Sequence, residues 1–75
     1  MSLSRLDGLG GRIRARRQAL GWSQMALAFE ATMSQSHLAG IECGERKNIE
    51  VKTLLKLAEA LGATPNELLG YPEQE

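Results

Sequence analysis

The apolar residues of this chain recur at spacings of three and four along most of its length, the period of a helix with one buried face. No stretch alternates between apolar and polar residues as a half-buried strand does. The pattern therefore predicts an all-α fold of five helices. The residues that share one face in each are, in chain order, Leu9, Ile13, Arg17 and Leu20; Leu27, Ala28 and Ala31; Leu38 and Ile41; Val51, Leu54, Leu55, Ala58 and Leu61; and Leu68 and Leu69.

Capping residues predict where these helices begin and end. Ser23 and Ser34 precede the second and third segments, and a serine oxygen there accepts a hydrogen bond from a free backbone N–H. Thr64-Pro65-Asn66-Glu67 is a capping box with proline in the first turn, which predicts a short fifth helix. We expect the second helix to reach about Ala31 and the fourth to span about Val51–Leu61. The segments end at glycines, which favour the left-handed C-cap conformation: Gly21, Gly44, Gly62 and Gly70.

The length of 75 residues is enough for one domain. We expect a flexible lead-in at 1–8, the domain at 9–70 and a tail at 71–75. The single cysteine, Cys43, cannot form an internal disulfide, which favours a reducing, cytoplasmic location. No apolar run is long enough to span a membrane, so no membrane partner is expected.

The formal net charge of zero hides an uneven distribution. Residues 1–47 carry seven basic and four acidic side chains, and residues 48–75 carry two basic and five acidic ones. The first part is thus +3 and the second −3. Such a molecule can turn a basic side towards phosphates. The arginines at 12, 14, 16 and 17 are equally compatible with an ordinary solvated helix face.

The block from Trp22 to Gly44 resembles the phage repressor/Cro-type helix-turn-helix family. The matching positions are Ser23-Gln24, Leu27-Ala28, Met33-Ser34-Gln35-Ser36, Leu38, Ile41-Glu42 and Gly44, with Ile13-Arg14, Arg17, Leu54-Leu55, Leu57-Ala58 and Ala60-Leu61-Gly62 in the flanks. The resemblance covers about residues 9–69. It implies a five-helix lambda-repressor-like domain with the helix-turn-helix at helices 2 and 3, and a sequence-specific regulator of transcription that binds double-stranded DNA.

The third helix is the expected reading helix. Its first turn carries Gln35, Ser36 and His37, and its end would enter the major groove. A glutamine can bond the N6 and N7 edges of adenine, serine suits several bases, and histidine can donate to a base or a phosphate. The alternative is that this first turn is an ordinary polar helix end at the surface, with no role in binding. Gly40, where some family members carry a reading side chain, offers none.

The resemblance also implies phosphate contacts and an internal ion pair. The residues expected to contact phosphate are Gln24, Ser34, Arg46, Lys47 and Asn48. The loop that carries the last three is one residue longer than the common family spacing, so which of them touches phosphate stays open. Arg17 and Glu42 resemble the family's ion pair, which joins the first helix to the end of the third.

The last two helices resemble those of compact restriction–modification controller proteins, in which they form the dimer interface. By this resemblance the chain is a homodimer that binds a palindromic operator, with reading helices about 34 Å apart. The residues expected in the interface are Leu55, Leu61, Leu68, Leu69 and Tyr71.

The other candidate classes of function are a protein-interaction module and an enzyme. Met25, Ala26 and Phe29 leave the outer face of the second helix apolar, which favours a protein partner on the Phe29 side and keeps an antitoxin or protein-interaction module as the alternative. An enzyme is not expected, and neither a cofactor nor a metal. The chain has one histidine and one cysteine, and no phosphate-binding glycine loop.

Overall fold

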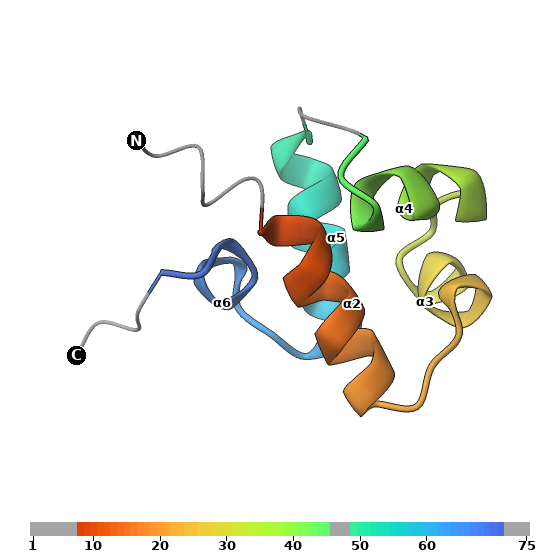
Figure 1. Ribbon diagram of the computed structural model, residues 1–75, viewed down its shortest axis with the longest axis horizontal. Coiled ribbons are helices and arrows are strands. Elements are labelled where there is room, and N and C mark those ends of the chain that lie inside the picture. The colour runs from red at the N-terminus through yellow and green to blue at the C-terminus, as the bar shows by residue number, and fades with distance from the viewer. Residues whose placement is uncertain (1–7, 46–48, 72–75) are drawn as a thin grey trace.

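The structure is a computed structural model that describes residues 8–45 and 49–71. In these residues it contains five helices and no strand, which confirms the predicted all-α class (Figure 1). They are α2 (Leu9–Ala19), α3 (Gln24–Glu30), α4 (Gln35–Glu42), α5 (Val51–Leu61) and α6 (Pro65–Leu69). Apart from Gly8 and Tyr71, the expected lead-in and tail lie outside the described residues.

The helix boundaries follow the capping residues closely. Ser23 accepts a hydrogen bond from the N–H of Ala26 at 3.0 Å, and Ser34 accepts one from His37 at 3.0 Å. At α6 the Thr64 hydroxyl accepts from the Glu67 N–H, and the Glu67 carboxylate accepts from the Thr64 N–H, so the capping box is complete. The four glycines that follow predicted helices all have φ between +67° and +85°.

Helix α2 lies centrally, with α3 and α4 on one side and α6 on the other (Figure 1). Its face towards α4 is shaped by Gly10, because a Cβ there would lie 2.2 Å from the carbonyl oxygen of Ile41 and 2.7 Å from that of Glu42. The two helices therefore approach more closely than any other residue at this position allows. The side chains buried most completely in the shared core are Ile13, Leu27, Leu38, Leu57 and Leu68.

Two arginines of α2 bond backbone carbonyls at the ends of α5 and α6. Arg12 donates from Nε to the Leu68 carbonyl at 2.7 Å and from Nη2 to the Leu69 carbonyl at 2.9 Å. Arg16 donates to the Gly62 carbonyl at 3.1 Å. All three carbonyls lie at or next to the C-terminal end of a helix. Carbonyls in this position have no hydrogen-bond donor within their own helix. A helix of five residues is not stable alone, so these tertiary contacts fix where it lies.

The structure corrects several predicted faces. Leu20 is at the C-cap of α2 and 46% exposed, because the chain turns away from the helix axis at that point. On α5, Val51 and Leu55 are 71% and 50% exposed, whereas Thr53 and Leu57 are buried. Leu57, not Leu55, lies in line with the other buried positions of α5 at helical spacing.

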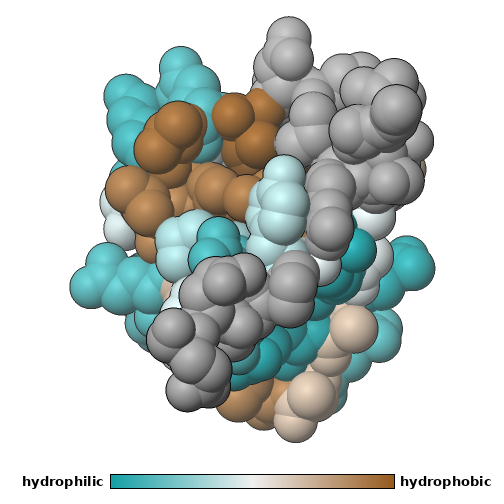
Figure 2. Space-filling view, turned by 90° about the vertical axis from the view of Figure 1, so that its left-hand side faces the viewer, coloured by the Kyte–Doolittle hydropathy of each residue, from teal (hydrophilic) through white to brown (hydrophobic). Residues whose placement is uncertain are grey.

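Two residues expected in a dimer interface are core residues instead. Leu61 is 3% exposed and Leu68 is 1% exposed, so neither side chain is available to a second molecule. Figure 2 looks onto the side where α6 lies and shows apolar side chains gathered in its upper part, at the height of the first turns of α5. The large apolar side chains that α5 exposes are Val51 and Leu55.

Candidate nucleic-acid interface

A tight corner at Thr32 joins α3 to α4. Thr32 has φ +56°, and its N–H donates to the Phe29 carbonyl at 3.1 Å. The next N–H, of Met33, donates to the Ala28 carbonyl at 2.9 Å. The chain thereby changes direction within a few residues, and both helices pack against the core through their apolar faces. This is a helix-turn-helix.

The first turn of α4 presents polar groups outward. Gln35 and Ser36 are exposed and His37 is half-buried, while Leu38 on the same helix is fully buried. The Ser34 cap satisfies only one of the free N–H groups that a helix N-terminus leaves unpaired. The remaining donors and the helix dipole favour an anion at this end.

A buried ion pair connects α2 to the end of α4, as the resemblance implies. Arg17 donates from Nε to Oε2 of Glu42 at 2.7 Å and from Nη2 to Oε1 at 2.9 Å. Its third contact is to the Trp22 carbonyl at 2.8 Å. Arg17 is 9% exposed and Glu42 6%, so this bidentate pair is shielded from water.

Gln24 joins the same network, which sequence reasoning missed. Its Nε2 donates to Oε1 of Glu42 at 3.1 Å, so Glu42 accepts bonds from two elements. Gln24 is the first residue of α3 and half-buried. The ion pair thus holds the side-chain amide of Gln24, an expected phosphate contact, at a fixed position beside the N-terminus of α3.

The network keeps both charges in place at neutral pH. Burial alone raises the pKa of the Glu42 carboxyl, but hydrogen bonds from Arg17 and Gln24, with the positive charges of Arg17 and Arg14, hold that pKa below its usual value. The hydrogen bond to Glu42 raises the pKa of Arg17, against an opposing effect of burial. The Glu42 carboxyl of the folded protein is therefore ionised at neutral pH.

The structure groups most of the expected contact residues near the helix-turn-helix. Gln24 and Ser34 are at or next to the starts of α3 and α4, and the reading residues follow Ser34 directly. Gly40 is buried on α4. The expected contacts at Arg46, Lys47 and Asn48 lie outside the described residues.

The fold and this surface define a class of protein: a helix-turn-helix domain with a polar first turn on the second helix of the pair. A model of the helix-turn-helix family matches residues 13–68 of the chain. The chain belongs to this family, which places it among DNA-binding regulators of transcription.

Two relatives are similar in sequence or structure. The control protein C.BamHI of Bacillus amyloliquefaciens is 37% identical over 49 residues, which are 65% of this chain and 59% of the length of that protein. The crystal structure of the restriction–modification controller protein C.AhdI from Aeromonas hydrophila matches with a TM-score of 0.80 and 42% identity. That match covers 87% of this chain and 97% of the other.

Two further properties concern the described residues only. No helix in 8–45 or 49–71 is long and apolar enough to cross a membrane. Within the same ranges, no group of three or more histidine, cysteine, aspartate or glutamate side chains is placed to hold a metal ion. The family itself is regulatory rather than enzymatic.

Proposed function

We propose that the protein binds a palindromic operator as a homodimer, with α4 of each subunit in the major groove. The observation that carries this proposal is the first turn of α4, where exposed Gln35 and Ser36 stand on a helix anchored by Leu38. Gln35 pairs with adenine, and Ser36 and His37 add contacts to neighbouring bases or phosphates. Because Gly40 is buried and has no side chain, reading falls to the first turn.

Phosphate contacts set the register on the duplex. In the proposed complex, Gln24 and Ser34 bind phosphates next to the N-termini of α3 and α4, where free N–H groups add further donors. The loop residues Arg46, Lys47 and Asn48 supply a second clamp. Support for Gln24 comes from its hydrogen bond to Glu42, because an amide already held in place loses less freedom on binding.

The proposed dimer interface consists of the exposed apolar residues of α5 and the C-terminal segment. Leu55 is 50% exposed, Tyr71 is 47% exposed, and Leu69 is partly buried. Val51, which is 71% exposed one turn before Leu55, extends the same surface. Burial of these side chains against a second copy would bring two reading helices to successive turns of one face of the DNA, about 34 Å apart.

The similarity to two controller proteins supports a more specific role. C.AhdI is named a restriction–modification controller protein and C.BamHI a control protein. We infer that this protein controls transcription of restriction–modification genes. A regulator of this kind must meet its DNA, so the proposal includes a cytoplasmic location.

Selection of bound sequences from a random DNA pool tests the proposal. The wild-type chain should enrich a palindrome, and Gln35→Ala should relax the preference at one symmetric pair of positions with a loss of about 1–3 kcal/mol per site. Leu55→Glu should give only the 8.2 kDa monomer in sedimentation and lose the palindrome. Absence of any enriched motif with the wild-type chain would contradict sequence-specific binding.

A second candidate function is an antitoxin or another protein-interaction module of the same fold. The observation that favours it is the exposure of Met25 and Phe29 on α3. In that case the selection experiment gives no motif, or only salt-sensitive binding without sequence preference.

A further inference from the structure

The outer face of α3 exposes two large apolar side chains one helical turn apart. Met25 is 65% exposed and Phe29 is 80% exposed, whereas Leu27 and Ala28 on the inner face are buried. Single exposed apolar residues are common on proteins, but neighbouring ones that form a patch mark interaction sites.

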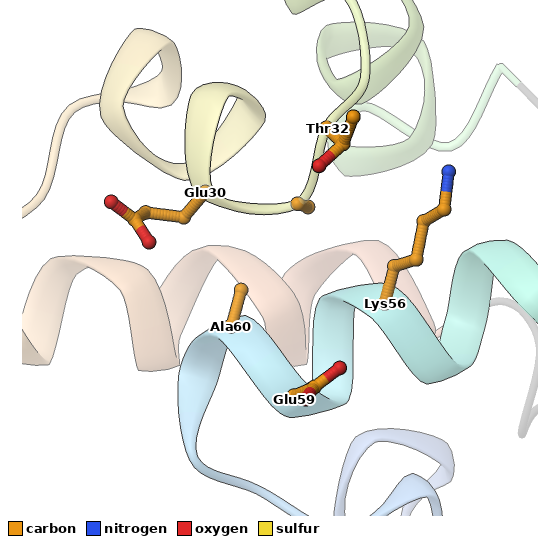
Figure 3. Close-up of a pocket in the computed structure, with 6 residues that line it drawn as sticks. Glu30, Thr32, Lys56, Glu59 and Ala60 are labelled. Atoms are coloured by element: carbon orange, nitrogen blue, oxygen red, sulfur yellow. The ribbon is translucent and has the colours of Figure 1, made fainter.

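Two shallow hollows adjoin along this face and meet at Glu30. The first has a volume of about 380 Å³ and is lined by Ser23, Met25, Ala26, Phe29 and Glu30. The second, also of about 380 Å³, lies between the end of α3 and α5 and is lined by Glu30, Ala31, Thr32, Lys56, Glu59 and Ala60 (Figure 3). Together they form one surface that is apolar at one end and charged at the other, called here the α3 groove.

The charges of the α3 groove restrict what can bind there. Figure 3 shows Glu30 on the α3 side of the second hollow, with Lys56 and Glu59 on the α5 side. The second hollow is lined by two carboxylates and one ammonium group, so the charged end has a surplus of negative charge. DNA and acidic peptides are repelled from it, and a basic side chain is attracted.

We propose that the α3 groove binds an amphipathic helix of another protein, with apolar side chains against Met25 and Phe29 and a lysine or arginine in the second hollow, which Glu30 and Glu59 line. A helix laid in a groove covers apolar positions spaced by three and four, which matches the one-turn spacing of Met25 and Phe29. The described residues contain no strand to which an extended peptide could add.

The partner site is separate from the proposed DNA contacts. Phe29 lies on the face of α3 opposite the buried residue Leu27, whereas Gln24 is bonded to Glu42 of α4. The apolar anchors Met25 and Phe29 are therefore not among the residues proposed to contact DNA. The proposal goes beyond operator binding and does not depend on it.

A peptide titration of the full chain, followed by amide NMR, tests the α3 groove. The probe is a synthetic amphipathic helix of leucine and lysine, about 15 residues long so that it can form a helix. Two matched peptides serve as controls, one with glutamate in place of lysine and one with the same composition scrambled. We expect saturable shifts at 25–30 and 56–60 with the leucine–lysine helix only.

Variants locate the binding to the α3 groove. Met25→Ala with Phe29→Ala should weaken binding at least about tenfold, as for a buried anchor, and Glu30→Gln should weaken it several-fold. Leu20→Ala removes an apolar side chain of 46% exposure at the end of α2 and should leave affinity unchanged. All replaced side chains are exposed, so each variant should keep the fold.

The outcomes separate this proposal from the proposed function. Equal binding of the glutamate or scrambled peptide, shifts outside the α3 groove, or no saturable binding would overturn it. Self-association that is lost in Phe29→Ala would assign the surface to a second copy and also overturn it. If the doubly substituted chain selects the same DNA motif as the wild type, the two sites are distinct. If even the wild type selects no DNA, operator binding alone fails.

Discussion

Glu42 is a buried carboxylate whose oxygens accept hydrogen bonds from Arg17 on α2 and Gln24 on α3. Glu42→Ala leaves the Arg17 guanidinium buried without its partner, and we expect a loss of about 3–5 kcal/mol in the free energy of unfolding. Urea denaturation measures it. Glu45→Ala, which removes an exposed carboxylate three residues later, should change stability by less than about 0.5 kcal/mol. Equal small losses in both variants would contradict a stabilising buried pair.

The same residue predicts a dependence of stability on pH. The folded-state pKa of the Glu42 carboxyl lies below the usual value of a glutamate, so the unfolded state binds the proton more readily. The resulting stability is fully present above the unfolded pKa and is lost as pH falls through the folded pKa. Unfolding free energies of wild type and Glu42→Gln, measured from neutral to acidic pH, should therefore converge on acidification. A gap that stays constant over this range would refute the assignment to Glu42.

Thr32 adopts a left-handed conformation that β-branched residues rarely take. Its φ of +56° lies at the corner between α3 and α4, and its side chain is exposed. A left-handed residue other than glycine costs about 1–3 kcal/mol, and asparagine tolerates this region better than threonine. Thr32→Asn should raise the melting temperature by several degrees, as about 1 kcal/mol does in a domain of this size. Thr32→Val, which keeps the branch, should bring no gain.

At the scale of elements, neighbouring glycines of α2 serve different purposes. At Gly10 a Cβ would overlap carbonyl oxygens of α4, whereas at Gly11 it would meet nothing within 4 Å. Gly11→Ala should therefore stabilise the protein by about 0.5–1 kcal/mol through helix propensity alone. Gly10→Ala should destabilise the protein despite the same gain in helix propensity, because α2 and α4 must move apart to make room for the Cβ. Thermal melts of the two variants compare them directly, and a stabilised Gly10→Ala would contradict the close packing.

The sequence predicted helix ends better than helix faces. A cap such as Ser23 or Ser34 acts on residues three positions away, so its effect is readable locally. Which apolar residues of α5 are buried depends on where its neighbours lie. For that reason the prediction that Leu55 shares the buried face was wrong, and the buried Leu57 was left out of that face. Leu68 was misplaced in an interface for the same reason.

Contacts between distant residues were the least predictable. Arg12 bonds carbonyls 56 and 57 positions away, and no local pattern identifies a backbone carbonyl as a partner. The Gln24–Glu42 bond joins two residues that were each singled out, but for unrelated reasons. The family resemblance predicted the Arg17–Glu42 pair. Composition and spacing alone do not predict it.

At the scale of the whole molecule, the internal contacts change the meaning of the charge distribution. Residues 1–47 carry seven basic side chains, yet Arg17 is paired with Glu42, and Arg12 is bonded to carbonyls of α6. Arg16 lies 3.8 Å from Glu67. Fewer cations are thus available to phosphates than the sequence suggests, and neutral donors such as Gln24 carry more of the proposed backbone contact.

This division between charged and neutral contacts predicts a distinctive response to salt. Each cation bound to a B-DNA phosphate contributes about 0.9 to the slope of log affinity against log salt. In a dimer every substitution occurs twice, so Lys47→Ala should reduce the slope by about 1.8 if Lys47 binds phosphate. Gln24→Ala should lower affinity without changing the slope, because an amide displaces no counterion. Fluorescence anisotropy on the selected operator over a range of salt concentrations measures both. A change of about 0.9 for Lys47→Ala indicates one bound subunit and contradicts the dimer, whereas no change removes Lys47 from the clamp.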